Sequence, residues 1–178
     1  MQKILLLLLN VIFGSLVLWS YYSGVTKTPD LSLKLWGGVP EILRNYIVGF
    51  MFISAIGYFF FTYNFLVNLD IKNTIFLGKF PSWSLHIVYL LILIPSSLWI
   101  DLTFKYMNSG SNLDWIYVIS ALYCVALSSI FLLLFIIDSG DPEKKFIYLA
   151  SFIGGGCFVF HTLFLDGLIW TIFFHKKL

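Results

Sequence analysis

Charge and cysteine are scarce in this chain. Only 11% of its 178 residues are charged, and the formal net charge is +2. Soluble domains carry about a quarter charged residues, so the composition excludes an ordinary soluble domain. It also excludes a disordered chain and a nucleic-acid-binding protein, which need abundant charge or a basic patch. The two cysteines cannot form a disulfide scaffold, and neither has the spacing to a second cysteine or histidine that a metal site requires.

Apolar and aromatic residues are abundant instead. Hydrophobic residues make up 60% of the chain and aromatic residues 20%, and the mean hydropathy is +0.92. The apolar runs are continuous rather than alternating, which disfavours a membrane β-barrel. Each is long enough to cross about 30 Å of hydrocarbon as a helix, the only structure that satisfies all backbone groups within one segment. The sequence predicts an all-α integral membrane bundle of five transmembrane helices in a single domain, 1–178, with spans at 4–22, 46–67, 85–104, 115–137 and 146–174.

The first run has a second interpretation as a signal peptide, because Lys3 precedes a leucine core. The run continues through Trp19, Tyr21 and Tyr22 without a small-x-small cleavage site, and this favours a retained first span. The predicted connections are 23–45, 68–84, 108–112 and 138–145. No internal repeat divides the chain, so we expect one domain in the membrane.

Three ionisable residues lie within or at the edge of the predicted spans. Asp101 precedes Lys105 by four residues, which predicts an ion pair at a helix end; the alternative is a carboxylate that faces a polar cavity below a kink at Pro95. His161 and Asp166 lie in the fifth span, where ionisable groups are costly and usually face protein or water. In an α-helix their spacing places them about 140° apart, so we do not expect them to face each other.

His161 has two interpretations, a neutral imidazole bonded to a neighbouring helix or a group that contacts a ligand or handles a proton. Haem ligation by His86 and His161 is not expected, because the two would differ in depth by about 12 Å. Small residues on two spans predict close helix packing, with backbone contact to a ligand as the alternative for the fifth span. These residues are Gly49, Ser54, Ala55 and Gly57 on the second span, and Ala150, Ser151 and Gly154–Gly156 on the fifth.

Three short strings carry a resemblance. Residues 34–40 read Lys-Leu-Trp-Gly-Gly-Val-Pro, similar to a Lys-Pro-x-Trp-x-Pro-Pro loop. Residues 54–58 read Ser-Ala-Ile-Gly-Tyr, similar to Ser-Ala-Met-Gly-Tyr, and residues 165–170 read Leu-Asp-Gly-Leu-Ile-Trp, similar to Leu-Asn-x-x-x-Trp. With five spans and a long first connection, the chain resembles the translocator protein family, also called tryptophan-rich sensory proteins. The loop lacks the double proline of that family, and residues 99–101 read Trp-Ile-Asp where the family has a Trp-x-Trp-Pro-like string.

The resemblance implies a five-helix bundle with a lipophilic pocket, roofed by the first loop, that binds tetrapyrroles, sterols or synthetic aromatic ligands. The preferred function is therefore binding or transport of a small lipophilic ligand without covalent chemistry. Tryptophans would form flat apolar walls, and His161 and Asp166 would orient a polar edge. The expected ligand contacts are Trp36, Tyr58, Trp99, Asp101, His161, Asp166 and Trp170.

The expected partners are membrane lipid, a small lipophilic ligand and, as an option, a second copy of the chain in a homodimer. No metal and no nucleic acid are expected, and no cofactor beyond a porphyrin or sterol bound as ligand. Two other functions stay open: a sterol-isomerase-like membrane enzyme that uses Asp101, His161 and Asp166 to move a proton, and a structural subunit or assembly factor of a membrane complex. Asp166 is expected to point into the bundle rather than at lipid.

Overall fold

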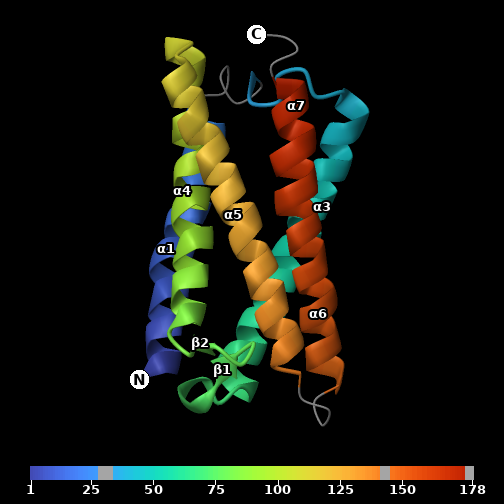
Figure 1. Ribbon diagram of the computed structural model, residues 1–178. Coiled ribbons are helices and arrows are strands. Elements are labelled where there is room, and N and C mark those ends of the chain that lie inside the picture. The colour runs from blue at the N-terminus through green and yellow to red at the C-terminus, as the bar shows by residue number, and fades with distance from the viewer. Residues whose placement is uncertain (28–33, 141–144, 175–178) are drawn as a thin grey trace.

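The computed structural model describes residues 1–27, 34–140 and 145–174 and shows an all-α bundle of five long helices (Figure 1). All five are long and apolar enough to cross a membrane, which confirms the predicted fold class. Residues 28–33 and 141–144, in two predicted connections, lie outside the described residues. The helical elements are α1 (Gln2–Thr26), α3 (Glu41–Tyr63) continued by the π-helical η1 (Asn64–Asn68), α4 (Ser84–Ser109), α5 (Asn112–Asp138), and α6 (Lys145–Val159) continued by the π-helical η4 (Phe160–Trp170) and α7 (Thr171–Phe174).

The helices follow a fixed order around the bundle. α1 packs on α4, α4 on α5, α5 on α6 and η4, and α3 on α6 and η4, while α1 also contacts η1. The N-terminal end of α1 lies at one end of the bundle, and α7 lies at the opposite end (Figure 1). The fifth helix is therefore flanked by α3 and α5, and α1 lies across the bundle from it.

Small residues bring α3 and α6 into backbone contact. A Cβ atom added to Gly57 would lie 2.5 Å from the Cα atom of Gly154. Beside this crossing, the Ser54 hydroxyl donates a hydrogen bond to the Cys157 carbonyl at 3.1 Å, and the Ser151 hydroxyl donates to the Phe60 carbonyl at 3.2 Å. Such contacts hold apolar helices together in lipid, where burial of apolar surface contributes little. The packing interpretation is therefore confirmed for these residues.

Three of the predicted packing positions have no such role. Gly49 and Gly156 have open space where a side chain would extend, and Ala55 is exposed. The close contact between α3 and α6 involves fewer small residues than predicted, because two crossing helices approach closely over only a short length.

A short β-hairpin, which the sequence did not predict, closes one end of the bundle. Strands β1 (Ile75–Phe76) and β2 (Phe80–Pro81) follow the 3₁₀ turn η2 (Ile71–Asn73). Phe76 stacks on Phe135 of α5, with the ring centroids 4.3 Å apart. Leu77 and Gly78 both have positive φ angles, 54° and 67°, which is typical of a tight hairpin turn. The Leu77 amide donates to the Asp138 carboxylate at 2.7 Å, so the turn is fastened to the end of α5.

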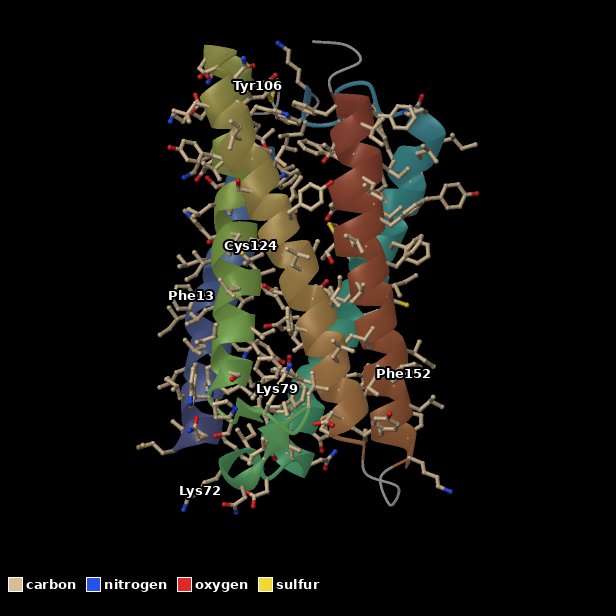
Figure 2. All side chains as sticks on the ribbon, viewed as in Figure 1. Phe13, Lys72, Lys79, Tyr106, Cys124 and Phe152 are labelled. Atoms are coloured by element: carbon tan, nitrogen blue, oxygen red, sulfur yellow. The ribbon has the colours of Figure 1, made fainter. Side chains whose placement is uncertain are left out.

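The outer surface of the helices is apolar. Leu18, Phe59 and Phe146 each expose more than 70% of their surface, and Phe152 projects outward from α6 (Figure 2). Large exposed apolar side chains of this kind suit a hydrocarbon environment and would be a liability in water. The chain thus has the architecture of a multi-pass membrane protein.

Candidate functional site

Aromatic side chains gather in two clusters at opposite ends of the bundle interior. Figure 2 labels Tyr106 at one end, and Lys72 and Lys79 at the hairpin end. The tryptophan cluster lies at the end of Tyr106 and includes Trp36, Trp99, Trp115, Trp170 and Phe174. The hairpin-end cluster includes Tyr58, Phe61, Phe65, Phe76 and Tyr89.

Trp170, at the end of η4, lies at the centre of the tryptophan cluster. Its ring centroid is 5.3 Å from Trp99, 6.1 Å from Trp115 and 4.4 Å from Phe174. Its indole Nε1 donates a hydrogen bond of 2.8 Å to the Leu35 carbonyl. Helices α4 and α5, the fifth helix and the first connection are therefore joined through one buried side chain.

The loop at residues 34–40 lies directly against α7. The Gly38 amide donates to the Phe173 carbonyl at 3.0 Å. Gly37 has a φ angle of +48°, and a Cβ atom there would lie 2.5 Å from the Phe174 carbonyl oxygen. Only glycine satisfies both conditions. Trp36, between Leu35 and Gly37, is half-buried, and the Arg44 guanidinium lies 5.9 Å from the centre of its ring.

His161 and Asp166 face each other on the fifth helix. The His161 Nε2 atom is 3.4 Å from the Asp166 Oδ2 atom. Our expectation that the two side chains point apart was wrong, because it assumed an α-helix. Residues 160–170 form a π-helix, in which backbone hydrogen bonds join residues five apart and so bring such residues onto one side.

Asp166 has few partners for a carboxylate in an apolar span. Its side chain keeps 28% of its surface exposed, against 10% for His161. In the described ranges no lysine or arginine forms an ion pair with it, and no hydroxyl or amide donates to its carboxylate. On α1, the Tyr21 hydroxyl is close enough to interact with the charge of Asp166. The Tyr21 ring also lies 6.2 Å from the ring of Trp99 on α4.

Two buried polar atoms of the predicted site residues have no hydrogen-bond partner within the described chain. They are Nε1 of Trp99, a donor, and Nδ1 of His161. A neutral His161 that faces an ionised Asp166 carries its proton on Nε2, which leaves Nδ1 as an acceptor. Ser20 Oγ and His86 Nδ1 are also unpartnered. Buried polar groups are nearly always hydrogen-bonded, so Trp99 and His161 are candidate contacts for a bound molecule.

Tyr58 lies away from the other predicted ligand contacts. Its hydroxyl donates to Asn10 Oδ1 of α1, and its ring packs against Phe61 and Phe158 in the hairpin-end cluster. The sequence assigned it to the site only through the resemblance of residues 54–58.

Asp101 is exposed on α4. The predicted ion pair between Asp101 and Lys105 is wrong, because the Lys105 ammonium lies 2.8 Å from Asp114 on α5 instead. The start of α5 lies beside the end of α4 across a tight turn, and Ser109 donates to the same carboxylate at 2.6 Å. Three of the predicted site residues, Trp36, Trp99 and Trp170, thus belong to the tryptophan cluster, and Asp166, which faces His161, lies four residues before Trp170 on the fifth helix.

The sequence reasoning missed three residues of this end, Tyr21, Trp115 and Phe174. Tyr21 could have been found as one of the aromatic residues that end the first span, but nothing in the sequence places that span opposite the fifth. Phe174 gave no signal among 19 phenylalanines.

The chain matches no protein-family model, and no curated protein or solved structure is significantly similar to it. The geometry of the tryptophan end is therefore the basis for assigning a function.

Proposed function

We propose that the protein binds or transports a small lipophilic molecule at the tryptophan end of the bundle, with tetrapyrroles and sterol-like compounds as candidate classes. The observation that carries this proposal is the pair of His161 and Asp166 on the fifth helix, where Asp166 precedes Trp170 of the tryptophan cluster by four residues. A carboxylate inside an apolar span costs about 2.5–3.5 kcal/mol on insertion scales. A group that costly, with His161 as its one ion-pair partner among the described residues, is better explained by a ligand than by packing.

The positions of the three resembling strings support this proposal. The loop at 34–40 and the string at 165–170 lie together, joined by the bond from Trp170 to the Leu35 carbonyl. The string at 54–58 contributes Ser54 and Gly57 to the α3–α6 crossing, which holds the fifth helix in place. A translocator-like protein is accordingly the family we propose, with flat apolar walls from the indoles and a polar edge from His161 and Asp166.

Tryptophan fluorescence tests the proposal. Protoporphyrin or cholesterol added to the purified protein should quench or shift the fluorescence saturably and raise the unfolding temperature. Asp166→Leu should weaken the binding, whereas Asp166→Asn should keep the fold because an amide preserves the shape. The control is Asp70→Asn, which removes an exposed carboxylate at the hairpin end. If neither compound gives a saturable signal or thermal stabilisation, binding of these lipophiles is excluded.

A second function is favoured by one observation, the contact of 3.4 Å between His161 and Asp166. An imidazole beside a carboxylate can take up and return a proton, as an isomerase of an apolar substrate requires. A sterol isomerase activity would then disappear in both His161→Gln and Asp166→Asn. Turnover that survives both substitutions would exclude this function and leave ligand binding in place.

A further inference from the structure

We infer that the site selects a lipophilic cation, such as an organic ammonium or phosphonium ion, over neutral and anionic molecules of the same size. This inference rests on the proposed function and narrows its ligand. It is drawn from the charge balance of Asp166 and from the chemistry of the rings around it.

No lysine or arginine described near this end of the bundle forms an ion pair with Asp166. Lys105 pairs with Asp114 at 2.8 Å. The Arg44 Nε atom donates to the Val39 carbonyl at 3.0 Å, and Lys27 lies 4.9 Å from the centre of the Trp19 ring. Lys34 is exposed in the loop, so within the described part of the chain only His161 lies within ion-pair distance of Asp166. A cationic ligand would supply the missing positive charge.

The walls of the site also favour positive charge. The faces of aromatic rings are electron-rich and attract cations, and indole is the strongest of them. Trp170 is buried and stacks on Trp115 and Phe174, so the rings available to a ligand are those of half-buried Trp99 and of Tyr21, 6.2 Å apart. A cation over these ring faces is attracted in the same sense as by the Asp166 carboxylate, so the two contributions add. A molecule with a carboxylate beside Asp166 is repelled, so this inference removes anionic tetrapyrroles from the candidate classes of the proposed function.

His161 provides an independent sign of a ligand. The residue is nine-tenths buried, and its Nδ1 atom has no partner in the residues described. An acceptor in this position calls for a hydrogen-bond donor. A protonated amine offers donors together with its charge, whereas a carboxylate offers neither.

Two ions of equal shape and opposite charge test the inference. Tetraphenylphosphonium and tetraphenylborate are both lipophilic and differ in the sign of their charge. Binding of each is measured on the full chain in nanodiscs of zwitterionic phosphatidylcholine, so that the lipid carries no net charge. We expect saturable binding of tetraphenylphosphonium that is at least tenfold tighter than binding of tetraphenylborate.

Substitutions test which residues determine the preference for the phosphonium ion. Asp166→Asn should weaken phosphonium binding at least tenfold without weakening borate binding, Asp166→Glu should restore most of the phosphonium affinity, and Asp70→Asn should change neither. If Asp166→Asn does not fold, Trp99→Leu provides the second variant, with the same loss expected for the phosphonium ion. Equal affinities for the two ions, or phosphonium binding that is unchanged in Asp166→Asn, would overturn the inference.

The same experiment separates this inference from the proposed function. Saturable binding of protoporphyrin or cholesterol without any preference for the phosphonium ion would retain the proposed function and reject charge selection. If none of the four compounds binds saturably, both are rejected.

Discussion

Gly57 and Gly154 show how a single atom controls the α3–α6 crossing. A Cβ atom on Gly57 would lie 2.5 Å from the opposite backbone, which cannot move without separating the helices. We expect Gly57→Ala to destabilise the bundle, because overpacking typically costs about 1–3 kcal/mol. Thermal unfolding in detergent measures the effect.

Gly49 on the same helix is the matched control. It has open space around it, so Gly49→Ala gains helix propensity, worth up to about 1 kcal/mol, with no clash. The two substitutions should therefore shift the unfolding temperature in opposite directions. Equal shifts would mean that the backbone contact does not hold these helices together.

A single site residue could be predicted where the sequence alone shows that placing it in the membrane costs free energy. His161 and Asp166 stand out because an ionisable group in an apolar run needs a reason. Tyr21 does not stand out, because its proximity to Asp166 depends on how α1 lies across the bundle. The partner of Lys105 was mispredicted for the same kind of reason, since Asp114 is nine residues away and adjacent only after the turn forms.

At the scale of the helix, the π-helical segment η4 sets the relation between His161 and Asp166. Its first turns are fixed by Thr162, whose hydroxyl bonds to the Phe158 carbonyl and to Ser129 of α5, both at 2.9 Å. Gly167, five residues later, passes over the Thr162 carbonyl, where a Cβ atom would lie 3.2 Å away. The hydropathy pattern does not distinguish these two types of helix, because a π-helix and an α-helix bury similar side chains.

A one-residue insertion tests the role of this segment. An alanine inserted between Leu163 and Phe164 moves His161 and Asp166 from five to six positions apart, so their side chains should separate. We expect the nitrogen NMR resonance of the His161 ring to shift to the position that it has in Asp166→Asn. An alanine inserted in the turn at 110–111 should leave that resonance unchanged. If the first insertion also leaves it unchanged, the pair does not depend on the π-helical register.

The elements were predicted unequally for physical reasons. Each apolar run must form a helix by itself to satisfy its backbone in lipid, so the five helices could be found one at a time. The hairpin could not, because strands of two residues show no alternation and their stability comes from Phe76 stacking on Phe135. The packing order of the helices could not be predicted from the sequence either. It depends on contacts such as that of Gly57 with Gly154 and on side-chain hydrogen bonds between helices.

At the scale of the molecule, five transmembrane helices determine which loops lie on the same side of the membrane. The hairpin with Lys79 lies at the end where α1 begins, and the turn after Asn108 lies at the end of α7 (Figures 1 and 2). If all five helices cross the bilayer, Lys79 and Asn108 face opposite compartments. Both residues are exposed, so each tolerates replacement by a reporter.

Cysteine labelling in intact cells measures this arrangement. Lys79→Cys and Asn108→Cys are made separately in a chain whose own Cys124 and Cys157, both half-buried within the helices, are replaced by alanine. One variant should react with a membrane-impermeant maleimide before permeabilisation, and the other only afterwards. The alanine-only chain is the control and should stay unlabelled. Labelling of both loops from the same side would show that α4, the helix between them, does not cross the membrane.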